Sequence, residues 1–391
     1  MTSAALEIAY IHSEKYVSIC DKHPKVKGRA SMVHDLIESY DLLSLMKIVA
    51  PFEASCNDLL TYHTEKYIQT LEFVEKRLVN SIESHEEDCF NEDEINYINE
   101  IGLGYDCSLF SNIYLYAKAI VGGTLSAANC LIDSQAVVSI NLNGGWHHAR
   151  TDEASGFCYV NDIVIGILKL LTKFKKVLYI DLDVHHGDYV EEAFLYTNKV
   201  VTFSIHKFGD GFFPGTGMKN SIGKGKGKYY TINAPLKDGV DNKMFTYVFK
   251  NIFTEVFHCF SPEVIVVQCG ADCLTGDPLG SFNLTSEALV DCVKFVLKEK
   301  VPTMILGGGG YNLSNTARCW TQVIAGILNT TLNNDIPEHD KWECYGPDFA
   351  LSFNPNHKKN ENSLEYIEDL LSFLKGNIKF MRGFSKNEIS I

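Results

Sequence analysis

The sequence predicts an α/β fold in which a parallel sheet is covered by helices on both faces. Two observations predict this fold: short apolar runs alternate with helix-like stretches, and polar clusters follow the apolar runs directly. Runs that are apolar throughout are typical of strands buried on both faces. The expected helices are 156–174 and 242–259. The expected strands are 136–143, 176–183, 200–206, 264–272 and 301–310.

The chain is expected to form a single domain over residues 1–391. No Pro/Gly/Ser-rich linker and no internal repeat divides it. We expect the core over about 8–345 and a C-terminal helical segment over about 364–382. The acid-rich stretch 81–94 is expected to be an exposed loop or helix edge, and the glycine- and lysine-rich stretch 223–230 a hairpin or loop.

Composition indicates a globular protein without nucleic-acid or membrane partners. Hydrophobic residues make up 46% of the chain, and the formal net charge is −14. Direct DNA binding needs clustered positive charge, so we exclude it. Acidity suits a basic partner such as a lysine-rich peptide, although it is also explained by solubility alone. The opening residues resemble no signal peptide, no apolar run approaches the length of a membrane span, and the twelve scattered cysteines indicate reduced thiols in the nucleus or cytoplasm.

A metal site is predicted at the end of the expected strand 176–183. Alternate side chains of a strand share one face, so Asp181, Asp183 and His185 are expected to point the same way. Asp272, at the end of the expected strand 264–272, completes a set of three ligands with Asp183 and His185. Three protein ligands are typical of catalytic zinc, and the same donors also accept Mn(II) or Fe(II). The alternative is a group of solvated turn residues and a helix cap.

Two adjacent histidines, His147 and His148, follow a pair of glycines in the sequence GGWHH. A neutral imidazole beside a metal site is a suitable general base at neutral pH. Asp181 and Asp188 are the carboxylates expected to orient these two rings. Without a metal site nearby, two surface histidines would be the better interpretation.

A tyrosine and three phenylalanines complete the expected site. Tyr311 follows four glycines in LGGGGYN, where its phenol could donate a hydrogen bond to a developing oxyanion. Phe157, Phe212 and Phe213 could line a narrow tube for an alkyl chain. The alternative is that the tyrosine packs against a tight turn and that the phenylalanines belong to the core.

Taken together, these motifs resemble the class I histone deacetylases from about Ile8 to Tyr345. The motifs that carry the resemblance are RASMVH, GLGYDC, GGWHHARTDEASGFCYVND, DLDVHHGD, FFPGTG, GADCLTGDP, LGGGGYN, ARCW and YGPD. The resemblance implies an arginase-related fold with an eight-stranded parallel sheet. It also implies a zinc-dependent hydrolase that removes acetyl groups from N6-acetyl-lysine in histones and in non-histone proteins, cohesin among them, and thereby regulates chromatin and transcription. Hydroxamates that mimic acetyl-lysine are expected to inhibit it.

The resemblance implies a role for each site residue. Zinc is held by Asp183, His185 and Asp272. The catalytic residues are His148 as general base and acid, His147 as an electrostatic partner, Tyr311 as oxyanion donor, and Asp181 and Asp188 as orienting carboxylates. The substrate-binding residues are Asp106 at the rim, Gly156, Phe157 and Phe213 in the tunnel, Arg29 at the floor of an internal acetate cavity, and also Trp146, Leu279 and Tyr311.

The resemblance also implies structural potassium. A first monovalent cation is held by backbone groups of Asp181, Asp183, His185 and Ile205 with the Ser204 hydroxyl. A second involves Phe194, Thr197, Val200 and Tyr230.

One residue departs from the family pattern, and two other functions stay open. The family reads HHGDG where this chain reads HHGDY, with Tyr189 in place of glycine. One alternative function is an arginase-like hydrolase with two bridged metal ions, for which Asp277 would be a further ligand. The other is a non-catalytic scaffold of a chromatin complex, against which the presence of every proposed ligand and of Tyr311 argues.

Overall fold

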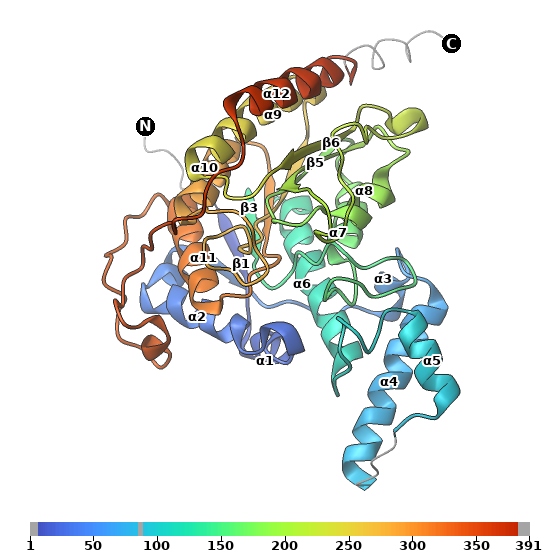
Figure 1. Cartoon of the computed structure of the whole chain (residues 1–391). Helices are drawn as coiled ribbons and strands as arrows, with labels where there is room; N and C mark the ends of the chain where they lie inside the picture. Colours follow the sequence, from blue (N-terminus) through green and yellow to red (C-terminus); the bar gives the residue numbers. More distant parts are fainter. Residues whose placement is uncertain (1–6, 85–88, 382–391) are drawn as a thin grey trace.

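The computed structural model describes residues 7–84 and 89–381, and its centre is one sheet of eight parallel strands (Figure 1). The strand order is β2-β1-β3-β8-β7-β4-β5-β6, and all seven pairings are parallel. The predicted fold class and the implied eight-stranded sheet are therefore confirmed. The strands are β1 Ile8–Ile11, β2 Lys47–Val49, β3 Val138–Asn141, β4 Val177–Asp181, β5 Val200–Lys207, β6 Thr231–Leu236, β7 Val264–Gln268 and β8 Thr303–Leu306.

Helices cover both faces of the sheet (Figure 1). Strand β4 shows why the sheet needs a layer of helices on each face. Its residues Leu178 and Ile180 pack into one core, and Val177 and Tyr179 pack into the other, because side chains alternate across a strand. A fully buried leucine or isoleucine contributes about 1.5–3 kcal/mol. The continuous apolar runs in the sequence are therefore the signature of a sheet with a hydrophobic core on each side.

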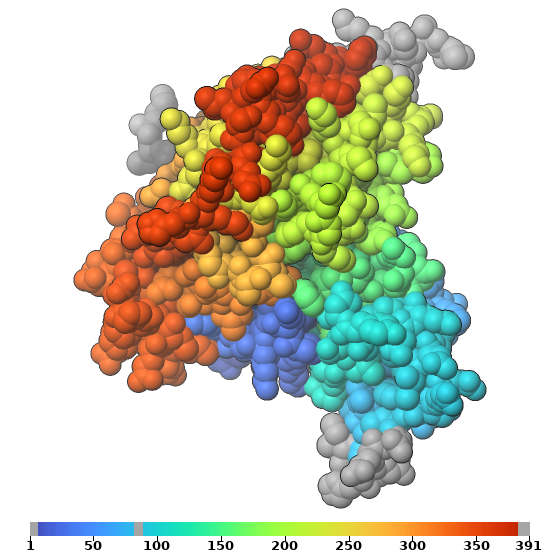
Figure 2. Space-filling view, in the orientation of Figure 1, coloured from blue at the N-terminus to red at the C-terminus, as the bar shows by residue number. Residues whose placement is uncertain are grey.

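The first core is lined by α2 and by α9–α12, and the second by α1 and by α3–α8. The C-terminal helix α12 packs against α9 and closes the first layer (Figure 2). The helices are α1 Glu14–Cys20, α2 Arg29–Ser39, α3 Cys56–Leu59, α4 Glu65–Ser84, α5 Glu92–Glu100, α6 Ile113–Ile132, α7 Asp162–Leu170, α8 Asp188–Phe194, α9 Asn242–Phe260, α10 Ser286–Leu297, α11 Leu313–Leu328 and α12 Leu364–Ile378. Short 3-10 helices span Pro24–Val26, Leu42–Leu45, Gly225–Gly227 and Trp342–Tyr345.

Helix α6 corrects the expectation that no segment is apolar enough to cross a membrane. Its 20 residues reach a mean hydropathy of 1.3, which meets that criterion by length and composition. However, 78% of its most apolar window is buried inside the fold. Residues Thr124 to Ala128 are all buried, and the helix contacts α7 and β3. In this structure α6 is a central core helix.

Several element boundaries differ from the predicted ones. The expected strand 176–183 ends at Asp181, and the expected strand 264–272 ends at Gln268. The expected helix 156–174 is restricted to α7, because the residues before it form an irregular turn. The acid-rich stretch 81–94 contains the end of α4 and the start of α5, with residues 85–88 outside the described part of the chain. Helix α12 spans Leu364–Ile378 of the expected segment 364–382, of which residue 382 is not described.

Candidate active site

The site lies beyond the carboxyl ends of four strands that are neighbours at the centre of the sheet. These strands are β3, β8, β7 and β4. The loop after β3 carries His147 and His148, and the loop after β4 carries Asp183 and His185. Asp272 follows β7, and Tyr311 follows β8. Parallel strands bring their carboxyl ends to one edge of the sheet, so four distant parts of the sequence meet there.

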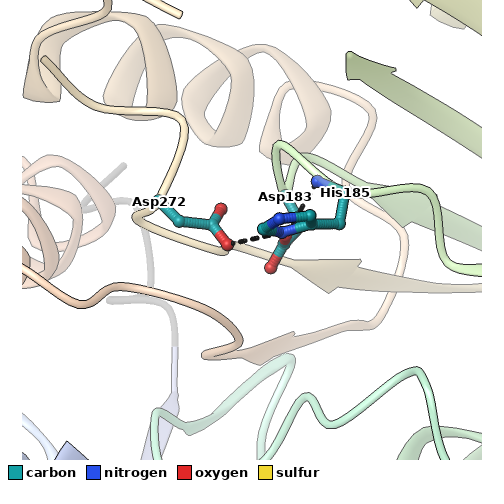
Figure 3. Close-up of side chains that lie close together, drawn as sticks. All are labelled: Asp183, His185 and Asp272. Carbon is teal, nitrogen blue, oxygen red and sulfur yellow. Dashed lines mark hydrogen bonds and ion pairs between the residues drawn. The ribbon is translucent and has the colours of Figure 1, made fainter. Parts of the chain in front are cut away.

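Asp183, His185 and Asp272 form the predicted ligand cluster (Figure 3). All three are buried, and one potential ligand atom from each lies within 4.8 Å of the others. Nδ1 of His185 is 3.1 Å from Oδ1 of Asp183 and 3.0 Å from Oδ2 of Asp272. Among the described residues, this is the one group of three or more such side chains with that geometry. Asp277 does not belong to it.

The chemistry of this cluster fits a divalent cation. Two buried carboxylates face each other across one imidazole, an arrangement that is unfavourable without positive charge. Burial and the charge of Asp183 raise the pKa of Asp272. Burial lowers the pKa of His185, but its hydrogen bonds to both carboxylates outweigh this effect and raise it to about 10. A cation between the carboxylates would take over the balancing charge that the imidazolium supplies.

Glycines beside the cluster leave room for the two carboxylates. A Cβ at Gly309 would lie 2.0 Å from Oδ2 of Asp272, and a Cβ at Gly270 would lie 2.1 Å from Oδ2 of Asp183. The glycine run of LGGGGYN is therefore explained in part by the close approach of its backbone to the ligand cluster.

The expected reason for the alignment of Asp181, Asp183 and His185 is wrong, because β4 ends at Asp181. The three residues do not share one strand face. Asp181 instead receives hydrogen bonds from His147 and, at 2.6 Å, from the Tyr179 hydroxyl. Asp183 and His185 come together on the loop that follows, where the Asp183 carboxylate accepts the His185 backbone N–H at 3.0 Å.

Sequence reasoning did not identify Gln268, which holds Asp183 from the other side. Its Nε2 donates to Oδ2 of Asp183 at 2.8 Å, and the backbone N–H of Gly309 donates to the same oxygen at 2.9 Å. The signal was present in the sequence: Gln268 is a polar residue that ends the apolar run of β7. A buried amide at the end of a strand needs a polar partner, and here that partner is a proposed metal ligand.

Each histidine of the adjacent pair contacts one of the carboxylates expected for it. Nδ1 of His147 is 2.8 Å from Oδ2 of Asp181, and Nδ1 of His148 is 2.8 Å from Oδ1 of Asp188. The two rings lie 3.9 Å apart between centroids. Both ring Nε2 atoms are thereby left to face away from their carboxylate partners.

The two histidines have opposite electrostatic environments. Burial lowers the pKa of His147, but the charges of Asp181 and Asp183 outweigh it and raise the pKa to about 9. Burial and the charge of His147 lower the pKa of His148 to about 4, against the opposing effect of Asp188. At neutral pH, His148 is therefore the neutral imidazole of the pair, as a proton acceptor must be.

The start of α7 fixes the turn that carries the two histidines. The Asp162 carboxylate accepts the backbone N–H groups of Gly145 at 3.0 Å and Trp146 at 2.9 Å. Nδ2 of Asn161 donates to the carbonyls of His147 and Ala149, both at 3.2 Å. Gly145 has φ +103, and a Cβ there would lie 2.6 Å from the Gly307 carbonyl oxygen, so this turn requires glycine.

A pocket of about 350 Å³ leads to the cluster. His148 and His185 lie at its polar side, and the Phe157 and Phe213 rings form apolar walls. It is lined by Asp106, His148, Gly156, Phe157, His185, Phe212, Phe213, Leu279 and Tyr311.

Two of the expected substrate-binding residues, Trp146 and Arg29, do not line this pocket. Both are buried behind it, with the Arg29 guanidinium 5.5 Å from the Trp146 ring. Nη1 of Arg29 donates to the Gly310 carbonyl at 3.0 Å. Their place is therefore the packed region between the histidine turn and the glycine run.

Asp277 positions Tyr311 through a hydrogen bond to its backbone. Its carboxylate accepts the backbone N–H groups of Leu279 at 2.9 Å, Tyr311 at 2.7 Å and Asn312 at 3.2 Å. This observation disfavours the binuclear alternative, since the carboxylate that would bridge a second metal already serves three backbone amides. As a site residue, Asp277 was predicted only as that extra ligand, and its structural role was missed.

The residues named for monovalent cations lie in two groups next to β4 and β5. Asp181 and Ser204 are register partners on these strands, and the Ser204 hydroxyl contacts His206 Nδ1 at 2.8 Å. In the second group, the carbonyl of Phe194 accepts the Thr197 N–H at 3.2 Å, and the carbonyl of Tyr230 accepts the Thr202 N–H at 3.0 Å. Ile205 and Val200 are buried residues of β5.

A buried carboxylate–imidazole–carboxylate cluster at the end of a pocket, beyond the carboxyl ends of a parallel sheet, fits the class of metal-dependent hydrolases with an α/β fold. Comparison with known proteins then identifies the family. The family model of the histone deacetylase domain matches residues 23–327. The chain belongs to the histone deacetylase family, and it is by that membership a protein lysine deacetylase.

Among curated proteins, the chain is similar to histone deacetylase 8 of several animals. It is 48% identical to the Xenopus tropicalis protein over 95% of this chain and 97% of the relative. For the Danio rerio protein the identity is 45%, over 96% of each chain. Histone deacetylase 1 of Homo sapiens is 41% identical over 92% of this chain and 72% of its own. Two features of the sequence, Trp146 and the Asp277-Pro278 pair, are typical of the eighth type, whereas Leu279-Gly280 is more typical of the other class I enzymes. The higher identities to histone deacetylase 8 agree with the first two features.

Proposed function

We propose that this deacetylase uses one zinc ion, held by Asp183, His185 and Asp272, to hydrolyse acetyl-lysine side chains of proteins. The observation that carries the proposal is the pocket of about 350 Å³ that has His148, His185 and Tyr311 in its wall. When bound, zinc supplies Lewis acidity, which polarises a carbonyl oxygen and makes water acidic near neutral pH. The same donors accept Fe(II), which we propose as an alternative ion in the cell.

His148 moves the proton in the proposed reaction. As a neutral base it accepts a proton from the attacking water, and as an acid it then gives a proton to the departing lysine amine. Asp188 holds its Nδ1, which leaves Nε2 to face the substrate. His147, kept charged by Asp181, contributes positive electrostatic potential beside the reacting carbonyl.

Tyr311 donates a hydrogen bond to the oxyanion of the tetrahedral intermediate. Burial and the charges of Asp272 and Asp183 raise the pKa of its phenol, so the hydroxyl keeps its proton. Two of the three proposed ligands are carboxylates, which reduce the charge of the metal centre. The phenol compensates for this by a donor placed where charge develops.

The walls of the pocket bind the substrate. Gly156, Phe157, Phe213 and Leu279 enclose the alkyl chain of the lysine, and Asp106 at the rim receives backbone N–H groups of the peptide. Arg29 lies at the floor of the proposed internal acetate cavity, and Trp146 is a further proposed substrate-binding residue. Structural potassium binds near β4 and β5, at Asp181, Asp183, His185, Ser204 and Ile205. A second ion binds at Phe194, Thr197, Val200 and Tyr230.

The acetylated partners that we propose are histones and non-histone proteins, cohesin among them. The protein is proposed to act at chromatin in the nucleus and also in the cytoplasm. Neither DNA nor a membrane is a proposed partner. Hydroxamates are proposed inhibitors, since their two oxygens can chelate a metal ion that has an open position.

Asp183→Ala tests the proposal, because a carboxylate is lost from a site with three ligands. The measurements are metal content per chain and acetate released from an acetyl-lysine peptide. We expect metal and activity to disappear together. Asp369→Ala, at an exposed residue of α12, is the matched control and should change neither.

Each alternative predicts a different result in the same experiment. Two metal ions per wild-type chain would support the binuclear hydrolase. A metal-loaded wild-type chain that releases no acetate would support the scaffold. A variant that keeps one metal ion and full turnover would overturn the ligand assignment.

A further inference from the structure

His23 is a buried histidine that the proposed mechanism does not use. It lies next to the 3-10 helix Pro24–Val26 and is only 1% exposed. Nε2 is 2.9 Å from the carbonyl oxygen of Phe157, and Nδ1 accepts the backbone N–H of Lys25 at 3.2 Å. The ring stacks on the Trp146 ring, with 4.6 Å between the centroids and an angle of 14° between the ring planes. Burial lowers the pKa of His23 to about 3, so the ring is neutral, with Nε2 as donor and Nδ1 as acceptor.

The partner of His23 is a strained part of the pocket wall. Phe157 has φ +65 and follows Gly156, which has φ +52, so two successive residues are left-handed. Such a conformation is costly for phenylalanine and persists only where its surroundings enforce it. Two backbone hydrogen bonds between Ser155 and Cys158, at 3.1 and 2.8 Å, close this turn. Two side chains hold it in addition: the Asp106 carboxylate accepts the Gly156 N–H at 2.8 Å, and His23 donates to the Phe157 carbonyl.

The same histidine places a lysine against the pocket. Nδ1 of His23 accepts the Lys25 amide, and the side chain of the same lysine lies over the Phe157 ring, with Nζ 4.7 Å from its centroid. Nζ is also 5.8 Å from the centroid of Tyr311. The Phe157 and Tyr311 rings touch edge to face at 5.6 Å. One imidazole therefore links the loop at 21–28 to two walls of the pocket.

We propose that His23 is a positioning residue that sets the width of the pocket at Phe157, and so makes the enzyme prefer acetyl over longer acyl groups. The inference rests on the proposed deacetylase function. Without the hydrogen bond to its carbonyl, Phe157 can relax from the left-handed region, and its ring moves away from Tyr311. A wider pocket then admits a longer acyl chain at less cost.

The test compares His23→Phe with His23→Gln. Phenylalanine keeps a ring against Trp146 but removes both hydrogen bonds, whereas glutamine keeps one donor and one acceptor. The measurement is kcat/KM for one peptide carrying acetyl-lysine or butyryl-lysine. We expect His23→Phe to raise the butyryl/acetyl ratio about five-fold, as for the loss of one neutral hydrogen bond, mainly through KM. His23→Gln should restore most of the selectivity.

His34→Phe is the matched control. His34 is a half-buried histidine that stacks on His12 at 3.5 Å and does not line the pocket. The His34→Phe substitution should leave the butyryl/acetyl ratio of kcat/KM unchanged. A His23→Phe enzyme in which both substrates lose kcat/KM equally would overturn the proposal and make His23 a residue of general stability.

Hydrogen exchange provides a readout that does not need catalysis, and its wild-type measurement does not need a variant. In the wild-type protein the Lys25 amide should be protected, and in His23→Phe this amide and those around Phe157 should exchange faster. An unprotected Lys25 amide in the wild type would overturn the proposal, because the hydrogen bond from this amide to His23 would then not persist in solution. A protected Lys25 amide in a protein that shows no deacetylation would instead contradict the proposed function. It would leave the positioning role of His23 standing.

Discussion

Tyr311 is held at the pocket by its backbone and its ring, and neither of these contacts uses its hydroxyl. Its N–H donates to Asp277, and its ring packs edge to face on Phe157. Both contacts remain in Tyr311→Phe. We therefore expect this variant to keep its fold and its metal, while turnover falls about 10²–10³-fold, the usual loss for one oxyanion donor.

Peptide binding distinguishes this loss from a packing defect. Titration with an acetyl-lysine peptide should give nearly the wild-type affinity for Tyr311→Phe. Near-normal turnover would mean that Tyr311 only packs.

Tyr189 departs from the family pattern without straining the backbone. It is the second residue of α8 and has no positive φ, so this position does not need glycine. Its N–H donates to Oδ1 of Asp188 at 3.0 Å, the same oxygen that contacts His148. The phenol oxygen accepts a hydrogen bond from Nε of Arg150.

We expect Tyr189→Gly to leave turnover within a few-fold, because glycine keeps the N–H that binds Asp188. The substitution should lower the free energy of unfolding by up to about 1 kcal/mol through added backbone freedom. Denaturant unfolding and a pH–rate profile are the measurements. A large gain in turnover, or a shifted basic limb, would show that Tyr189 perturbs the Asp188–His148 pair.

At the scale of elements, the sequence predicted five of the eight strands and did not predict β1, β2 and β6. Strands β1 and β2 have 4 and 3 residues and lie towards one edge of the sheet. Two residues of β2 are exposed, so no continuous apolar run marks it. Its pairing depends on tertiary contacts, which local pattern does not encode.

The sequence predicted the cluster of proposed ligands, but not all the residues that hold it. Asp183, His185 and Asp272 follow strong strands and have distinctive chemistry. Gln268 and Asp277 act through hydrogen bonds to residues distant in sequence, or to backbone amides of a neighbouring loop. Such contacts depend on the path of the loops, and no motif in the chain specifies that path.

His63, which contacts the start of α7, makes the stability of this region depend on pH. His63 accepts the Asn161 N–H on Nε2 at 3.0 Å and contacts the Thr151 carbonyl through Nδ1 at 3.3 Å. Burial lowers the pKa of His63 to about 4, against the opposing effect of the hydrogen bond to Thr151. Its folded pKa lies below the unfolded value of about 6.5, so its contribution to stability is complete above pH 6.5 and declines as the pH falls towards 4.

We expect the free energy of unfolding to fall by about 2 kcal/mol for this histidine between pH 7 and pH 5. His63→Gln keeps a donor and an acceptor but does not titrate, so its stability should depend less steeply on pH in the same range. Denaturant unfolding at several pH values measures both slopes. Parallel slopes for the two proteins would contradict the assignment to His63.

At the scale of the whole molecule, the net charge of −14 is expected to affect how readily the protein captures its substrate. A strongly acidic protein attracts a lysine-rich peptide over a distance that is set by the salt concentration. Most of this attraction acts before the acetyl-lysine enters the pocket. It should therefore affect capture of the peptide, and it should leave the chemical step unchanged.

We expect KM for a lysine-rich acetylated peptide to rise several-fold between about 0.01 M and about 0.3 M salt, because the Debye length falls from about 30 Å to less than 8 Å. The rate constant kcat should stay constant, and a peptide with glutamines in place of the flanking lysines should show a nearly flat KM. Potassium must be held fixed while tetramethylammonium chloride is varied, because the proposed potassium sites would otherwise respond to the same salt. Equal salt effects on the two peptides would leave solubility as the explanation of the acidity, whereas a salt effect on kcat alone would place the charge sensitivity inside the site.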